Sequence, residues 1–174
     1  MNLAPTASTT AQLAMGDALA VAVLHAKGIG PNEFARAHPG GSLGRKLLTR
    51  VRDIMRTGEA VPAVPLQATL GEAILEISRK RMGMTAIVDA DRRIAGMFTD
   101  GDLRRALERV TDLRVTGIAQ VMTVAPRTIG ADALATEAVH LMESNRITQL
   151  LVRDDGGILI GALNMHDLFQ SKVV

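Results

Sequence analysis

The sequence predicts an α+β fold, α/β-like in the alternation of its helices and strands, in which two copies of a small module follow a helical segment. Motifs in residues 51–111 recur in residues 115–174 at a nearly constant offset, which indicates a duplicated unit. Each copy combines helical periodicity with two short strand-like runs, which predicts a small sheet with two helices. Residues 1–50 lack the repeat, and their Ala-rich composition is typical of helices.

Composition and charge exclude several classes of protein. The chain of 174 residues contains no Cys, so it has no disulfides, thiolate metal sites or cysteine nucleophiles. The net charge is only +2 and three Phe are the only aromatic residues, which argues against a nucleic-acid partner. No apolar run approaches about 18 residues and no signal-peptide pattern opens the chain. We therefore expect a cytoplasmic protein with no membrane partner, and the spacing of the four His predicts no metal and no cofactor.

Two helices and a linker are predicted in residues 1–50. An Ala-rich helix is expected over Ala11–Lys27, with Gly28 as the residue that ends it. A short helix is expected from Pro31 through Ala37. The apolar face of residues 11–24 would be partly exposed, which predicts self-association into a dimer or tetramer. The basic run that follows is expected to be a solvated linker, with an anion site as the alternative: Arg45, Lys46, Arg50, Arg52 and Arg56.

The first copy contains five predicted elements. A leading strand is expected at Ala60–Val64, and apolar spacing predicts a helix over Thr69–Met82. Strand-like runs follow at Thr85–Asp89 and Ile94–Phe98, separated by a turn rich in Asp and Arg. A closing helix is predicted over Asp100–Arg109.

The second copy repeats this order. A leading strand is expected at Val124–Ile129 and a helix over Asp132–Asn145. Two strands are predicted at Thr148–Val152 and Ile158–Leu163, joined by an Asp-Asp-Gly-Gly turn, and a helix over Met165–Gln170 closes the copy. One copy of about fifty residues cannot bury an adequate core, so the two copies should pack together.

Six pairs of like residues anchor the repeat, and all six keep one order along the chain. Most partners lie 65 residues apart, and the extremes are 67 and 63. Chance rarely produces so many anchors with so little drift. The pairs are Met55 with Met122, Ala73 with Ala138, Thr85 with Thr148, Gly96 with Gly161, Asp102 with Asp167, and Leu103 with Leu168.

A motif that closes each copy carries a family resemblance. The pattern G-h-h-[T/S/N]-x-x-D-L, in which h is hydrophobic, occurs at Gly96–Leu103 and again at Gly161–Leu168. An h-x-x-h-M piece also leads each copy, at residues 51–55 and 118–122. Each copy therefore resembles a cystathionine-β-synthase (CBS) domain. The resemblance implies a tandem pair of the regulatory kind that binds adenosyl or other nucleotide ligands in clefts between the copies.

Residues 1–50 extend the resemblance. The segments A-P-T-x-S-T-T, M-G-D-A-L-A and H-P-G-G-x-L-G-R-K, with T-D-G-D-L-R-R in the first copy, closely resemble the arabinose-5-phosphate isomerase family. The resemblance implies that residues 1–50 are the tail of a sugar-isomerase (SIS) domain. The parent enzyme would convert ribulose 5-phosphate to arabinose 5-phosphate for Kdo and lipopolysaccharide synthesis. His38 would be catalytic only in that parent, because the other catalytic groups lie in an earlier part of the SIS domain, so we expect an inactive fragment.

The closing motifs supply the first candidates for ligand binding. Thr99 with Asp102, and Asn164 with Asp167, have the spacing of a helix capping box, which is the purely structural alternative. The functional alternative uses the same geometry. The free N–H groups of a helix start attract phosphate, and the Asp would accept hydrogen bonds from ribose hydroxyls.

Further candidates follow from the repeat. Thr85 and Thr148 enter the first central strand of each copy, and Met55 and Met122 fit either a base pocket or plain core. The two clefts are predicted to differ, because Thr99 is matched by Asn164 and Gly101 by His166. Arg104 and Arg105 then favour an anionic ligand in the first cleft, although a solvated helix face explains them equally well. The full set of proposed ligand-binding residues is Thr99, Asp102, Thr85, Asn164, Asp167, Thr148, Met55, Met122, Arg104 and His166.

Three hypotheses on partners stay open. The ligand could be CMP-Kdo, the activated end product that the resemblance implies, or an adenine nucleotide such as AMP or ATP. In the third hypothesis the pair binds no ligand and only holds subunits together in an oligomer.

Overall fold

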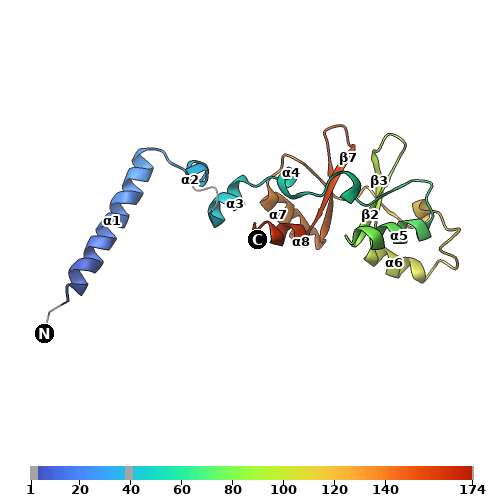
Figure 1. Cartoon of the computed structure of the whole chain (residues 1–174), viewed down its shortest axis with the longest axis horizontal. Coiled ribbons are helices and arrows are strands. Elements are labelled where there is room, and N and C mark those ends of the chain that lie inside the picture. The colour runs from blue at the N-terminus through green and yellow to red at the C-terminus, as the bar shows by residue number, and fades with distance from the viewer. Residues whose placement is uncertain (1–3, 38–40, 174) are drawn as a thin grey trace. The chain divides into compact units, whose positions relative to one another are not determined.

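The computed structural model describes residues 4–37 and 41–173, and it divides the chain into two compact units, Met1–Leu48 and Thr49–Val174 (Figure 1). The described part of the first unit contains helices and no strand. These helices are α1 (Thr6–Ala26), α2 (Pro31–Ala37) and α3 (Ser42–Leu48). The first two confirm the predicted helices, and Gly28 has the expected positive φ of 63° after α1. Helix α3 lies in the stretch that was predicted to be linker.

Helix α1 has no buried residue within the structure and is apolar over most of its 21 residues. By length and composition alone it could cross a membrane, and it is the one helix among the described residues that meets this criterion. The buried helix of a soluble domain meets the same criterion.

The second unit contains two small sheets, one for each copy (Figure 1). In copy 1 the strand order is β1-β2-β3-β4, and only β1 and β2 are parallel. These strands are β1 (Ala63–Pro65), β2 (Met84–Val88), β3 (Ile94–Thr99) and β4 (Thr123–Val124). In copy 2 the order is β5-β6-β7, with β5 and β6 parallel. These strands are β5 (Thr128–Gly130), β6 (Gln149–Arg153) and β7 (Leu159–Asn164).

Two helices pack on each sheet, as predicted. They are α5 (Leu70–Lys80) and α6 (Asp100–Leu107) in copy 1, and α7 (Ala135–Asn145) and α8 (Met165–Gln170) in copy 2. Local chemistry sets the start of α5: the Glu72 carboxylate accepts from the Thr69 N–H at 2.7 Å, and the Glu72 N–H donates to the Thr69 hydroxyl at 3.2 Å. This hydrogen bonding holds the pKa of Glu72 below its usual value.

The leading segment of each copy crosses to the other copy. We define these segments as residues 50–58 and 117–125; they contain the short helix α4 (Val51–Ile54) and the 3-10 turn η2 (Ile118–Gln120). Strand β4 belongs to copy 2 in sequence, yet it pairs with β3 of copy 1. Reciprocally, the Arg56 N–H donates to the Ala162 carbonyl at 2.8 Å and the Ala162 N–H donates back at 3.1 Å.

The core follows the same exchange. Val51 and Ile54 of the first leading segment pack in the apolar core of copy 2, among residues of α7 and β6. Ile118 and Val121 of the second leading segment pack in the core of copy 1. A third cluster joins the two sheets directly. Its buried members are Val61, Met82, Met84, Ala86, Val88, Met97, Leu151, Leu159 and Ala162.

Two glycines permit the crossing segments to approach the sheets. A Cβ on Gly161 would lie 2.5 Å from the Met55 sulfur and 3.0 Å from the Arg56 carbonyl oxygen. A Cβ on Gly96 would lie 2.5 Å from the Met122 sulfur and 3.0 Å from a carbonyl oxygen of β4. Because the backbone itself is so close, any side chain at these positions forces the leading segment away from its sheet.

Gly161→Ala is therefore expected to lower the free energy of unfolding by about 1–3 kcal/mol, since Met55 and the adjoining backbone must move. Gly130→Ala is the matched control, because nothing lies within 4 Å of its added Cβ and its φ is not positive. Urea unfolding followed by circular dichroism measures both. Equal stabilities for the two variants would contradict the close approach.

Candidate ligand-binding clefts

The start of α6 brings the predicted pair of copy 1 together. The Thr99 N–H and hydroxyl donate to Asp102 Oδ2 at 2.9 and 2.7 Å, and the Asp102 N–H donates to the Thr99 hydroxyl at 3.2 Å. Asp102 is buried although it carries a carboxylate. The capping geometry predicted from the spacing is therefore present, and it fixes the rotamer of both side chains.

The equivalent pair of copy 2 has the same geometry at the start of α8. The Asn164 N–H donates to Asp167 Oδ2 at 3.0 Å, and the Asp167 N–H donates to Asn164 Oδ1 at 3.0 Å. In both copies Oδ2 is thus committed to the cap. The other oxygen, Oδ1, is the acceptor that distinguishes the two clefts.

At Asp102, Oδ1 accepts hydrogen bonds from one neutral donor and from one charged donor whose side chain is exposed. The Thr123 hydroxyl, from the leading segment of copy 2, donates to Oδ1 at 3.1 Å. The Arg105 guanidinium, from the next turn of α6, donates to the same atom at 2.5 Å. The Arg105 side chain is 71% exposed and that of Asp102 only 8%, so in this i,i+3 ion pair the cation is solvated while the carboxylate is buried.

At Asp167 the second oxygen is held by a cation from the other copy. Arg56 donates from Nε and Nη2 to Oδ1 at 3.2 and 3.1 Å, and Nε also lies 3.3 Å from Oδ2. Nη1 donates to the Lys80 carbonyl at 3.2 Å. The Arg56 side chain is only 25% exposed and that of Asp167 only 11%, so the pair is poorly solvated and charge-assisted.

The prediction of a solvated basic linker is wrong for Arg56. Arg56 is part-buried against Asp167, a residue 111 positions away in sequence. Arg52 forms an ion pair with Asp132, and Arg50 donates to the Asp132 carbonyl. The leading segment is folded onto copy 2, so Arg56 is part-buried there, whereas Arg50 and Arg52 contact Asp132 and stay exposed to water.

The two Thr predicted to be equivalent occupy different positions. Thr85 is fully buried in β2, and its hydroxyl lies 3.4 Å from the Ala86 carbonyl. Thr148 is exposed and lies one residue before β6. Strand register matches Thr85, opposite Phe98, with Leu150, opposite Leu163. The structural offset is therefore 65, and the 63-residue spacing of the two Thr does not reflect equivalence.

The remaining predicted residues lie around the clefts. Met55 and Met122 are part-buried against Gly161 and Gly96, so they close the sheet edges beside each Asp. Arg104 is exposed on α6. His166 is exposed on α8, and its Nε2 lies 2.8 Å from the Gln170 amide nitrogen. His38 lies outside the described residues.

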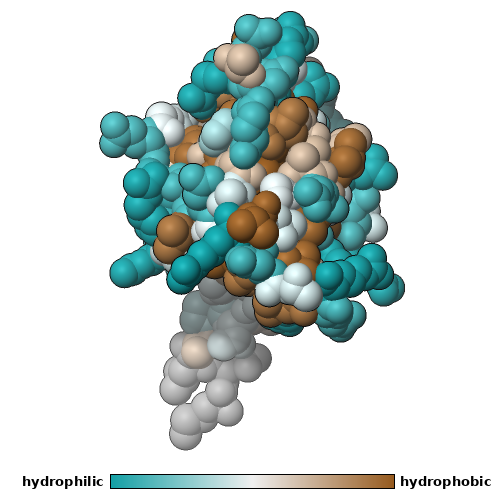
Figure 2. Space-filling model, turned by 90° about the vertical axis from the view of Figure 1, so that its right-hand side faces the viewer, coloured by the Kyte–Doolittle hydropathy of each residue, from teal (hydrophilic) through white to brown (hydrophobic). Residues whose placement is uncertain are grey.

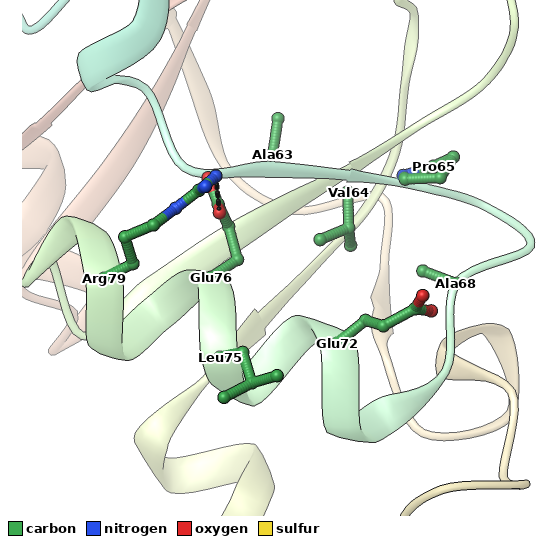
Figure 3. Close-up of a pocket in the computed structure, with 8 residues that line it drawn as sticks. All are labelled: Ala63, Val64, Pro65, Ala68, Glu72, Leu75, Glu76 and Arg79. Atoms are coloured by element: carbon green, nitrogen blue, oxygen red, sulfur yellow. Dashed lines mark hydrogen bonds and ion pairs between the residues drawn. The ribbon is translucent and has the colours of Figure 1, made fainter.

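A hollow of about 370 Å³ borders Asp102. Its lining residues come from α6 and the second leading segment: Asp102, Arg105, Ala106, Arg109, Val110, Gln120, Val121 and Met122. A second hollow of the same size lies between β1 and α5, where Glu76 and Arg79 form an ion pair at 2.5 Å (Figure 3). None of the predicted ligand residues lines this second hollow, so it is a separate feature of copy 1.

Comparison with known families decides what the duplicated unit is. The family model for the CBS domain matches residues 51–109 and again residues 118–173. The chain belongs to the CBS-domain family. Its second unit is accordingly a CBS pair, and the resemblance read from the closing motifs is confirmed.

Curated relatives match the whole chain. It is 51% identical to arabinose 5-phosphate isomerase KdsD of Pseudomonas aeruginosa strain PAO1 and 54% identical to KdsD of Salmonella typhimurium strain LT2, in each case over all 174 residues. These 174 residues correspond to 53% of each relative, so the chain spans about half the length of the curated relatives it matches.

Solved structures share the CBS-pair fold. CBSX2 in complex with AMP superposes with a TM-score of 0.61 at 20% identity, over 71% of this chain and 95% of that one. The CBS domain protein PAE2072 of Pyrobaculum aerophilum, complexed with AMP, gives 0.61 at 22% identity, over 68% and 88%. The CBS pair of MJ0100, in complex with 5-methylthioadenosine and S-adenosylmethionine, gives 0.62 at 21% identity, over 70% and 94%. At these identities the likeness establishes the fold.

Sequence reasoning missed Arg56 and Thr123, the two residues that distinguish the clefts. A signal for both was present, because each directly follows the Met of the repeated h-x-x-h-M motif. Aligning the copies on that motif places Arg56 and Thr123 at one position. The alignment does not show that each leading segment crosses to the other copy, and it is this crossing that brings Arg56 to Asp167 and Thr123 to Asp102.

Arg56→Gln should lower the free energy of unfolding by about 1–3 kcal/mol, because it leaves a part-buried carboxylate without its cation. Arg105→Gln makes the same chemical change at a 71% exposed cation and leaves the Thr123 hydroxyl on Asp102 Oδ1, so it should cost less than about 1 kcal/mol. Thermal and urea unfolding of the two variants and the unaltered chain measure the difference. A cost for Arg105→Gln equal to that for Arg56→Gln would contradict the assignment of Arg56 as the stronger partner.

Proposed function

We propose that the CBS pair binds a nucleotide or nucleotide sugar and that this ligand regulates an arabinose 5-phosphate isomerase of which the chain forms part. The observation that carries the proposal is the group at the start of α6. Thr99, Asp102 and Thr123 converge there beside a hollow of about 370 Å³. Thr123 comes from the other copy, so a ligand at this point would contact both halves of the pair.

The chemistry of this cleft suits a nucleotide. The Asp102 carboxylate can accept a hydrogen bond at Oδ1 from a ribose hydroxyl once Arg105 moves into solvent. The positive end of the eight-residue helix α6 favours a phosphate, to which the Thr99 hydroxyl could donate once it is released from Asp102. Met122 offers an apolar, polarisable surface to a base. The AMP, methylthioadenosine and S-adenosylmethionine held by the CBS neighbours support an adenosine-type ligand.

CMP-Kdo is the more specific proposal for the ligand. It combines a ribose and a phosphate with an acidic sugar, and it would report the end product of the pathway that the isomerase family feeds. Arg104, Arg105 and Arg109 on α6 supply positive charge close to the hollow. An adenine nucleotide is the competing proposal, since the solved CBS neighbours were found with adenosine compounds.

The isomerase reaction itself is proposed for the longer protein and not for these residues. The relatives are about twice as long as this chain, and His38 would act only together with catalytic groups outside it.

We also propose a cytoplasmic protein that self-associates into a dimer or tetramer. Exposed apolar side chains on α1 support self-association, namely Leu13, Met15, Leu19, Val21 and Val23. On the face of copy 1 seen in Figure 2, apolar groups are interspersed with hydrophilic ones.

Isothermal titration of the chain with AMP, ATP, CMP and CMP-Kdo should give saturable binding for at least one ligand. Asp102→Ala should weaken that binding by about tenfold or more, because the hydroxyl acceptor is lost. Asp155→Ala removes the same charge from an exposed position in the β6–β7 turn and should leave binding unchanged. A flat titration with every ligand, on a folded sample, would favour the purely structural role in oligomerisation.

A further inference from the structure

We propose that Arg56 closes the cleft beside Asp167, so that the CBS pair binds one ligand, beside Asp102. This inference rests on the proposed function of nucleotide binding and adds which of the two clefts is used. The duplication supplies two equivalent carboxylates, and a symmetrical pair would offer two equivalent sites. The structure contains a difference at the two carboxylates themselves that removes this equivalence.

The difference lies at the position after the Met of each leading segment. On one side this residue is Thr123, a short neutral side chain that donates a single hydrogen bond to Asp102. On the other side it is Arg56, whose guanidinium covers both oxygens of Asp167. Since the cap already uses Oδ2, the acceptor that a ribose hydroxyl would need at Asp167 is taken by Arg56.

Arg56 is also held from the sides that do not face Asp167. Its backbone pairs with Ala162 through two hydrogen bonds, and Nη1 donates to the Lys80 carbonyl. The side chain therefore cannot move into solvent without giving up several partners at once. Arg105, the cation beside Asp102, lies on an exposed turn of α6. Among the described residues, Asp102 is its one hydrogen-bond and ion-pair partner.

Two consequences follow for the pair. A ligand beside Asp102 displaces only Arg105, a cation that is already 71% exposed and belongs to the next turn of α6. A ligand beside Asp167 would have to break a part-buried ion pair and also the hydrogen bond from Arg56 to the Lys80 carbonyl. The cleft beside Asp102 therefore binds the ligand more tightly, and the Arg56–Asp167 ion pair in the other cleft stabilises the contact between the copies.

Equilibrium dialysis with AMP and with CMP-Kdo counts the bound ligand per chain. We expect one for the unaltered chain and two for Arg56→Gln, in which Asp167 becomes available. Arg79→Gln is the matched control, because it also removes a cation from a poorly exposed carboxylate, at the separate hollow between β1 and α5, and it should still bind one. Two ligands on the unaltered chain, or one on Arg56→Gln, would overturn the inference while leaving nucleotide binding intact. No binding to either chain would overturn the proposed function and the inference together.

A second measurement covers the case in which Arg56→Gln does not fold. In the unaltered chain labelled with methyl-¹³C methionine, AMP or CMP-Kdo should shift the Met122 methyl signal, beside Asp102, and leave that of Met55, beside Arg56, in place. Equal shifts of both signals would show two occupied clefts and overturn the inference. A shift of Met55 alone would overturn it as well, because the ligand would then lie on the side that Arg56 closes.

Discussion

The reciprocal crossing of the two leading segments is the constraint on which the rest of the second unit depends. Each segment completes the sheet edge and the core of the other copy, through β4 on one side and the Arg56–Ala162 pairing on the other. A single copy would therefore lack an edge partner and part of its core, including Val51 or Ile118. Fifty residues bury too little surface to make up that loss, so the copies stabilise each other.

The same crossing builds the clefts and makes them unequal. The residues that follow Met55 and Met122 each contact the Asp of the opposite copy. A substitution in one copy therefore changes the hydrogen bonding of the Asp in the other. Thr123 and Arg56 show the result: one Asp keeps an exposed neighbour and a hollow, and the other becomes half of a part-buried ion pair. One position in each duplicated module thus differs in chemistry while the hairpins β2–β3 and β6–β7 keep the same register.

Most elements of the fold could be predicted from the sequence because their signals are local. Periodicity and turn residues located both hairpins and their helices to within a few residues, and the closing motifs located Thr99, Asp102, Asn164 and Asp167. The exchange could not be predicted, since the pairing of Arg56 with Asp167 joins residues 111 positions apart and leaves no periodic trace. Matching Thr85 with Thr148 failed for a related reason: strand register, and not residue identity, sets equivalence.

Urea unfolding read separately in each copy tests the central claim of mutual stabilisation most directly. Met84 and Met97 report on copy 1, and Met142 and Met165 on copy 2, through their methyl-¹³C signals. If the crossing segments hold both copies together, all four signals change at one urea concentration and with one slope, as for a single cooperative unit. Separate midpoints for the two copies would contradict the account.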